Sequence, residues 1–156
     1  RGAAAGAGVS LAAACDLIIA DEDAFFTLAY CHIGTTPDGS SSFHLPRAIG
    51  IKKTLEMTLL GNRYTAQEMA DMGLVNFVVK ADELDSECGK LAEKLAAGPT
   101  FVYGKAKKLM YRSLENEFEA QLQLEGECFA ECAGRRDFRE GVEAFVGKRK
   151  ANFTGA

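Results

Sequence analysis

The sequence predicts an α/β protein in which strands and helices alternate over residues 1–80 and helices alone fill residues 81–156. Two observations lead to this prediction. Short apolar runs bounded by glycine or acidic residues, a pattern typical of strands, lie in the first part of the chain. In the remainder, apolar residues recur about every three to four positions with few interrupting glycines or prolines, as they do in amphipathic helices.

The first part opens on the run GAAAGAG, which predicts a tight glycine turn leading into a buried helix at residues 9–15. The apolar runs LIIA and AFFTL then predict two short strands, at residues 17–20 and 24–28, joined by an acidic turn. A loop rich in glycine, proline and hydroxyl residues is expected at residues 29–42.

Helices and one further strand are expected beyond this loop. Two short helical segments end at Gly50 and Gly61, and Thr65 with Glu68 fits the capping box T-x-x-E, which begins a helix that Gly73 ends. The run LVNFVV predicts a strand at residues 74–79. The remaining helices are expected at residues 82–97, 101–113, 117–133 and 137–148.

Composition excludes several classes of function. The net charge of −4 argues against a broad surface for nucleic acid, and no apolar run reaches the roughly 18–20 residues that cross a membrane. The five cysteines form no CxxC pair, so neither a disulfide framework nor a zinc site is expected. Reduced thiols indicate the cytoplasm. Cys128 and Cys132 lie one helical turn apart, but no histidine lies near them to complete a metal site.

Asp38 is the first candidate for chemistry, because it stands alone among turn residues in the stretch HIGTTPDGSSS. The tetrapeptide TPDG is a good turn, so a structural role for this aspartate is one interpretation. A carboxylate presented to a substrate at the mouth of a partly apolar pocket is the other. Tyr30, eight residues earlier, is expected to line the same pocket, whereas His32 and His44 are expected to be structural.

The glycine turn before the first helix is the second candidate. Gly6 and Gly8 let a ligand approach the backbone closely, and a helix N-terminus offers free N–H groups to an oxyanion. Close packing of a helix against a strand is the other interpretation of these residues, and the spacing alone favours it. The run lacks both the GxGxxG spacing and a P-loop lysine, so nucleotide binding is not supported.

Taken together, four segments resemble the crotonase (enoyl-CoA hydratase/isomerase) family. In order they are GAAAGAGVSLAAACDLIIADEDAFF, IGTTPDGSSSFHLPRAIG, LLGNRYTAQEMADMGLVNFVV and EGVEAFVGKRKANF. The resemblance covers essentially the whole chain and corresponds to the second half of a family member. It implies that residues 1–80 form the later part of the ββα spiral core with an active-site loop, and that residues 81–156 form a helical oligomerisation region.

The resemblance also implies partners and cofactors. Family members bind acyl-CoA thioesters, with coenzyme A as part of the substrate and no metal or other cofactor, and they assemble as trimers or dimers of trimers. A chain that opens on RGAAAGAGVSL begins inside a domain, so we expect residues 1–156 alone to be inactive or poorly folded.

Site residues follow from the same resemblance. The backbone N–H of Ala7, flanked by Gly6 and Gly8, takes the place of the second donor of the oxyanion hole that holds the enolate. The two glutamates that add water in hydratases are replaced by Ser10 and Tyr30, so hydration by two carboxylates is not expected. Asp38 falls where isomerase branches place their acid.

The resemblance therefore favours an enzyme that shifts a double bond of an enoyl-CoA, with Asp38 carrying the proton. Three alternatives stay open: an enzyme for aromatic acyl-CoA in which Asp38 is nucleophile or base and Tyr30 and Phe26 contact the ring, an enoyl-CoA hydratase, and a non-catalytic acyl-CoA-binding protein. In the tail, Lys148 and Phe153 are expected near the coenzyme A end of the substrate, with a solvated terminus as the competing interpretation.

Overall fold

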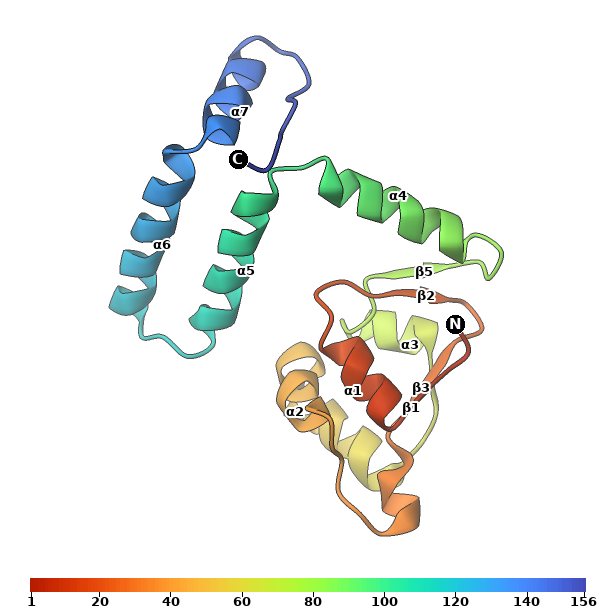
Figure 1. Ribbon diagram of the computed structural model, residues 1–156. Helices are drawn as coiled ribbons and strands as arrows, with labels where there is room; N and C mark the ends of the chain where they lie inside the picture. Colours follow the sequence, from red (N-terminus) through yellow and green to blue (C-terminus); the bar gives the residue numbers. More distant parts are fainter. The chain divides into compact units, whose positions relative to one another are not determined.

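The computed structural model describes residues 1–156, in two units, Arg1–Cys88 and Gly89–Ala156, each of which is described by itself (Figure 1). The first unit contains five strands, β1 (Ala3–Ala5), β2 (Ile19–Asp21), β3 (Phe25–Thr27), β4 (Tyr64–Thr65) and β5 (Phe77–Val79). Its helices are α1 (Ala7–Ala13), the short 3-10 helix η1 (Ala29–Ile33), α2 (Ser41–Leu60) and α3 (Ala66–Asp71). Helix α4 (Leu84–Ala96) begins in the first unit and continues into the second.

The strands of the first unit pair over long sequence distances. Strand β1 runs parallel to β3, with Ala3 opposite Phe25, and β4 runs antiparallel to β3 on its other side. Strand β2 instead pairs in parallel with β5, more than 50 residues later. The two strands expected at residues 17–20 and 24–28 both form, but although they are neighbours in sequence they belong to different sheets.

The core of this unit is apolar and closely packed. Val9 of α1, Leu28, and Leu45 and Met57 of α2 are completely buried, together with Met69 of α3. Each full burial of such a side chain contributes about 1.5–3 kcal/mol relative to exposure. The strands and helices are thus held by side chains from four different segments of the chain.

Two local sequence signals are confirmed in this unit. Gly50 has φ 77° and ψ 157°, so it breaks α2 into the two predicted segments, and the second one ends at Gly61 with φ 62°. The capping box also forms: Glu68 N donates to Thr65 Oγ1 at 3.2 Å, and Thr65 N donates to Glu68 Oε2 at 2.7 Å. Both signals depend only on residues that are close in sequence.

The start of the chain differs from the prediction. Residues 3–5 form a strand rather than part of a turn, and the helix expected at residues 9–15 begins at Ala7 and ends at Ala13. Alanine has little intrinsic preference for strands, so pairing with β3 decides the conformation here. The helix is also buried along one face only, because Leu11 is 73% exposed.

The second unit contains α5 (Thr100–Ser113), α6 (Phe118–Ala133) and α7 (Arg136–Val146), which confirms the three predicted helices to within a few residues. Helices α5 and α6 lie side by side (Figure 1). No helix of the chain is both long enough and apolar enough to span a lipid bilayer.

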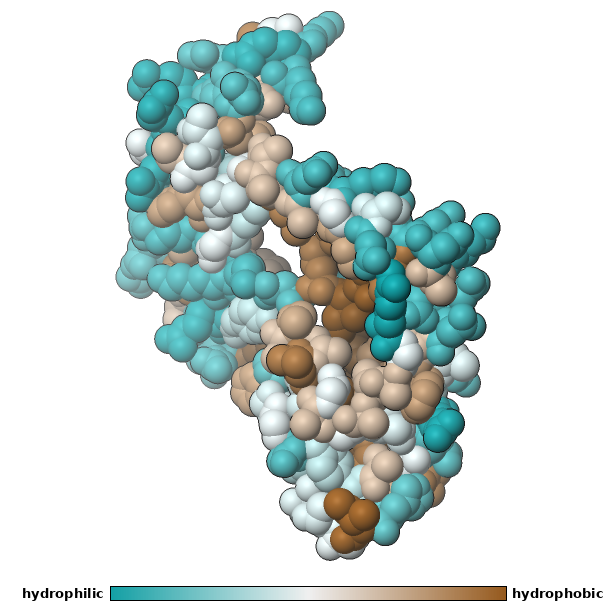
Figure 2. Space-filling view, turned by 45° about the vertical axis from the view of Figure 1, so that its right-hand side comes forward, coloured by the Kyte–Doolittle hydropathy of each residue, from teal (hydrophilic) through white to brown (hydrophobic).

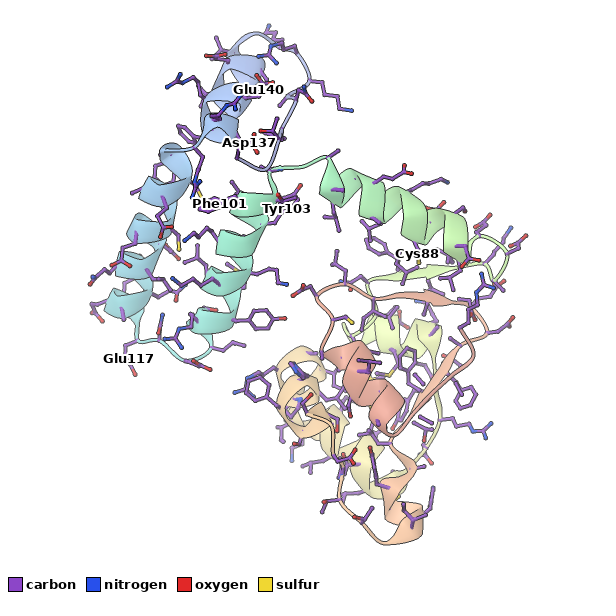
Figure 3. The ribbon with its side chains drawn as sticks, viewed as in Figure 1. Cys88, Phe101, Tyr103, Glu117, Asp137 and Glu140 are labelled. Carbon is purple, nitrogen blue, oxygen red and sulfur yellow. The ribbon has the colours of Figure 1, made fainter.

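The chain after α7 folds back onto that helix. Asp137 and Glu140 lie on the α7 side of the returning segment (Figure 3). The Asp137 carboxylate accepts from the backbone N–H groups of Thr154 and Gly155 at 2.9 and 2.8 Å. Glu140 accepts two hydrogen bonds from the Arg149 guanidinium at 2.6 and 2.9 Å. These polar contacts fasten the last ten residues to the unit.

Large apolar side chains remain exposed in the second unit. Phe118, Phe129, Phe145 and Val146 are each at least 66% exposed. Hydrophobic residues lie among hydrophilic ones on the molecular surface (Figure 2). Apolar exposure on this scale is typical of surfaces that another protein surface covers.

Candidate functional site

The turn that carries Asp38 lies between η1 and α2 in the first unit. Gly39 and Ser40, which follow the aspartate, both adopt left-handed φ values of 60° and 78°. This conformation is costly for a non-glycine residue such as Ser40. The turn is therefore held in its shape by contacts with its surroundings, and the Asp38 side chain is exposed.

Two hydroxyl groups hold the backbone of this turn. The carbonyl oxygen of Asp38 accepts from Ser10 Oγ of α1 at 2.8 Å and from Ser41 Oγ, at the first position of α2, at 3.1 Å. Both serines are 1% exposed. The turn is thus fastened at one point to two helices. The role of Ser41 was not predicted, although the run SSS after the turn was a possible signal of hydroxyl contacts to the backbone.

Tyr30 contacts the carboxylate of Asp38 directly. Its hydroxyl donates to Asp38 Oδ1 at 2.5 Å. The pKa of Tyr30 is raised above its usual value of 10.0, first because its hydroxyl donates to Asp38, then because of burial and the negative charge of Asp38. The Asp38 backbone and the Ser10 hydroxyl act in the opposite direction. The structure therefore brings together three of the predicted site residues, Ser10, Tyr30 and Asp38.

Ser10 and Phe26, whose contacts with a substrate stay predictions, are both buried in the first unit. Ser10 lies on the buried face of α1, and Phe26, at 3% exposure, is part of the apolar core. Phe26 points inward because neighbouring residues of a strand face opposite sides, and Phe25 takes the outer side, where it stacks with Arg63.

The glycine turn lies beside Tyr30. Gly6 precedes α1 with φ 52°, and a Cβ atom at this position would lie 3.3 Å from the Tyr30 hydroxyl oxygen. The Gly6 N–H donates to Thr27 O at 2.9 Å and so is occupied. Ala7 and Gly8 are exposed, and N–H groups in the first turn of a helix have no partner within the helix. The oxyanion role of the Ala7 N–H and the ligand contacts of Gly6 and Gly8 stay predictions.

An apolar cavity of about 200 Å³ adjoins the turn. Pro37 and Ser41, on either side of Asp38 in the sequence, contribute to its wall, and Asp38 itself does not. Most of the other lining residues belong to α2. The apolar lining residues include Leu28, which lies outside α2, and Pro46, Ile51 and Leu55 of α2. Neither Asp38 nor Tyr30 lines this cavity, so a pocket with the carboxylate at its mouth stays a prediction.

The remaining chemical candidates do not join this site. His32 lies near Cys31, with its Nδ1 3.9 Å from Sγ, and His44 packs edge-on against Phe43. Neither histidine hydrogen-bonds Asp38, so no Ser-His-Asp arrangement forms. The five cysteine thiols are free, and no three side chains of the types that bind metals come together.

Lys148 and Phe153 belong to the second unit. Lys148 follows α7 with φ 49° and is exposed. Phe153 is half-buried and packs against α7, where a Cβ atom on Gly141 would lie 3.5 Å from its ring. Their expected contact with the coenzyme A end of a substrate stays a prediction.

Comparison with known proteins gives a consistent result. The family model described as "Enoyl-CoA hydratase/isomerase" matches residues 1–156. A protein of Rhodobacter capsulatus named "Probable enoyl-CoA hydratase" is 40% identical over 155 residues, which is 99% of this chain and 60% of that protein. The "1,2-epoxyphenylacetyl-CoA isomerase" of Escherichia coli is 38% identical over 156 residues, covering 99% of this chain and 59% of that protein.

The solved structures that resemble this chain have the same kind of name as its sequence relatives. The crystal structure of an enoyl-CoA hydratase from Polaromonas sp. JS666 superposes with a TM-score of 0.93 at 36% identity, covering 99% of this chain and 60% of that one. The chain thus spans about 60% of the length of the relatives that it matches.

Proposed function

Because this chain belongs to the enoyl-CoA hydratase/isomerase family, within the crotonase superfamily, we propose that the protein acts on an acyl-CoA thioester and moves a carbon–carbon double bond. Asp38 is the group that carries the proton. Relatives are named both as hydratases and as isomerases, so the family alone leaves the choice of reaction open.

One observation supports isomerisation over hydration. The positions at which the resemblance expects two glutamates hold Ser10 and Tyr30, and both of these contact Asp38. The first unit therefore offers one anchored carboxylate at the site rather than two. Addition of water by the two-glutamate route needs a second carboxylate, whereas an allylic shift needs a single group that takes up and returns a proton.

The proposed reaction balances with Asp38 alone. In a 3-enoyl-CoA, the Asp38 carboxylate takes a proton from C2, and the electrons of that C–H bond form an enolate of the thioester. The backbone N–H of Ala7 stabilises the enolate oxygen, as in an oxyanion hole. Asp38 then returns the proton to C4, and the double bond is left between C2 and C3. Nothing is consumed besides the substrate.

The test compares two reactions of the full-length protein. We expect turnover of a 3-enoyl-CoA to exceed hydration of the corresponding 2-enoyl-CoA. Asp38→Asn keeps the shape of the side chain and removes its ability to accept a proton, so we expect kcat to fall about 10²–10⁴-fold.

Asp23→Asn is the matched control, because Asp23 is an exposed acid of the same unit in the turn between β2 and β3. We expect it to leave kcat unchanged. Efficient hydration by the wild-type protein, or full isomerase activity in Asp38→Asn, would show that the acid and base have been assigned to the wrong residue. No turnover of either substrate would favour a non-catalytic acyl-CoA-binding protein.

A second candidate is supported by the Escherichia coli relative, whose name describes an isomerase of an aromatic epoxide linked to coenzyme A. Here Asp38 acts on an aromatic acyl-CoA as base or nucleophile. Mass spectrometry of the protein trapped during turnover separates the two roles, because a nucleophilic carboxylate carries the substrate as an ester and a base does not. Faster turnover of the aromatic substrate than of a 3-enoyl-CoA would favour this candidate.

Assembly and location complete the proposal. The exposed apolar side chains of α6 and α7 support a homotrimer or a dimer of trimers, as the family resemblance implies. Sedimentation of the full-length protein tests this assembly, and a monomer at micromolar concentration would contradict it. We expect the protein in the cytoplasm, with no metal or separate cofactor.

A further inference from the structure

We infer that Tyr30 and Ser10 are positioning residues for the Asp38 carboxylate: the tyrosine fixes one carboxylate oxygen, and the serine fixes the backbone from which the carboxylate projects. This inference rests on the proposed function, because it assigns these residues a role in the same site. Neither residue carries a proton in the reaction.

The two oxygens of the Asp38 carboxylate are in different situations. Oδ1 accepts the Tyr30 hydroxyl at 2.5 Å, whereas no group of the chain donates to Oδ2. A hydrogen bond from a hydroxyl to a carboxylate is charge-assisted, and such bonds are among the stronger kinds in proteins. It fixes the orientation of the carboxylate and leaves Oδ2 as the oxygen that faces a substrate.

Tyr30 is itself held from two sides. Its ring lies against Gly6, where a Cβ atom would approach the hydroxyl oxygen to 3.3 Å and Cζ to 3.4 Å. Its backbone carbonyl accepts from Thr35 N at 3.2 Å, which ties η1 to the loop before Asp38. Because the pKa of Tyr30 is raised, its hydroxyl stays protonated, and so remains a donor, throughout the neutral range.

Ser10 acts on the backbone. Its buried hydroxyl donates to the Asp38 carbonyl at 2.8 Å. The Ser10 side chain also packs against Gly39, because a Cβ atom added to Gly39 would lie only 3.0 Å from Ser10 Cβ. The turn therefore rests directly on α1. Ser41 donates to the same carbonyl from α2 at 3.1 Å, so the backbone of Asp38 is fixed from two helices.

These contacts have a kinetic consequence. Displacing a reacting group by about 1 Å can reduce the rate about 10²-fold. We expect Tyr30→Phe, which keeps the ring, to lower kcat roughly tenfold to a hundredfold with little change in KM, because the carboxylate loses its orientation and the binding surfaces remain. Ser10→Ala is expected to have a smaller effect than Ser10→Ala with Ser41→Ala, since the second serine still holds the carbonyl.

Tyr64→Phe is the matched control for the tyrosine. The Tyr64 hydroxyl also donates to a carboxylate of the first unit, Glu56 Oε1 at 3.1 Å, but this pair has no contact with Asp38. We expect Tyr64→Phe to keep the wild-type kcat. An equal loss of kcat in both variants would show that removing any such hydroxyl weakens the unit, and would overturn the positioning role.

A second measurement does not depend on catalysis. Titration of tyrosine absorbance in the full-length protein, compared with Tyr30→Phe, identifies the ionisation of Tyr30. We expect this ionisation to move to lower pH in Asp38→Asn, because the charged acceptor and its hydrogen bond are lost. A Tyr30 that merely packs against Gly6 would titrate identically in both proteins, and that result would overturn the inference.

The two measurements separate the inference from the proposed function. If Asp38→Asn moves the Tyr30 ionisation but leaves turnover intact, the contact stands and Asp38 is not the base. If Asp38→Asn abolishes turnover while Tyr30→Phe has wild-type kcat, Asp38 is the base and Tyr30 does not position it.

Discussion

Replacing Gly39 by alanine tests the packing of the turn that carries Asp38. Gly39 has φ 60°, and a residue with a Cβ atom loses about 1–2 kcal/mol in this left-handed conformation. The new Cβ would also lie 3.0 Å from Ser10 Cβ and 3.2 Å from Ser10 Oγ, closer than ordinary contact. Since Ser10 is buried, the turn must move, and the hydrogen bond from Ser10 Oγ to Asp38 O is lost.

The magnitude follows from these two contributions. Backbone strain of about 1–2 kcal/mol and loss of one hydrogen bond, about 1 kcal/mol, lower the free energy of unfolding by about 2–3 kcal/mol. Gly34→Ala is the matched control, because Gly34 lies in the same loop with φ 70° but has no atom within 4 Å of a Cβ. The free energy of unfolding of Gly34→Ala should therefore fall only by the backbone strain of about 1–2 kcal/mol. Urea unfolding of the full-length protein measures both variants, and kcat should fall further in Gly39→Ala.

A double substitution sharpens the test. Ser10→Gly removes the atoms with which the new side chain collides, so in that background Gly39→Ala should cost no more than Gly34→Ala does. Equal losses of stability for Gly39→Ala and Gly34→Ala in the wild-type background would refute the reasoning, because contact with Ser10 would then contribute nothing.

Three further predictions concern stability. Leu45→Ala, at a completely buried position of α2, should lower the free energy of unfolding by about 2–5 kcal/mol, whereas Leu59→Ala in the same helix, at 68% exposure, should change it by about 0.5 kcal/mol or less. Thr65→Ala removes the cap of α3 and should lower the free energy of unfolding by about 1 kcal/mol. An unchanged urea midpoint would contradict this. Thr65→Ser keeps the capping hydroxyl and should retain most of the wild-type stability. The Arg149 guanidinium, with a backbone N–H, lowers the pKa of Glu140 from 4.5 to about 2, so its contribution to stability is present above pH 4.5 and is lost as the pH falls toward 2. Arg149→Gln should weaken the dependence of the melting temperature on pH in that range, and an unchanged dependence would exclude the pair as its source.

Local signals in the sequence were sufficient where the structure depends on near neighbours. Thr65 and Glu68 form their capping box, and Gly50 and Gly61 divide and end α2, because each feature is decided within one or two helical turns. Strand partners were not predictable in this way. Residues 17–20 and 24–28 read as adjacent strands, and only contacts with distant segments assign them to separate sheets.

In the candidate site, too, some features could be predicted from the sequence and others depended on distant contacts. Asp38 and Tyr30 were predicted as neighbours in one pocket, and the structure joins them by a hydrogen bond. The buried positions of Ser10 and Phe26 were not predictable, because a sequence does not tell which face of a seven-residue helix or a three-residue strand the core will cover. In the structure, the buried Ser10 hydroxyl donates to the backbone of the turn that carries Asp38.

The close packing of Gly39 on Ser10 constrains how this protein can evolve. A glutamate at position 10 requires the space through which the turn passes, so that substitution displaces Asp38 before a second glutamate is in place. A glutamate at position 30 removes the hydroxyl that holds Asp38. In either order, the first substitution damages the existing acid before a pair of glutamates can replace it. The contacts that hold Asp38 are therefore the same contacts that a second glutamate at position 10 or 30 would remove.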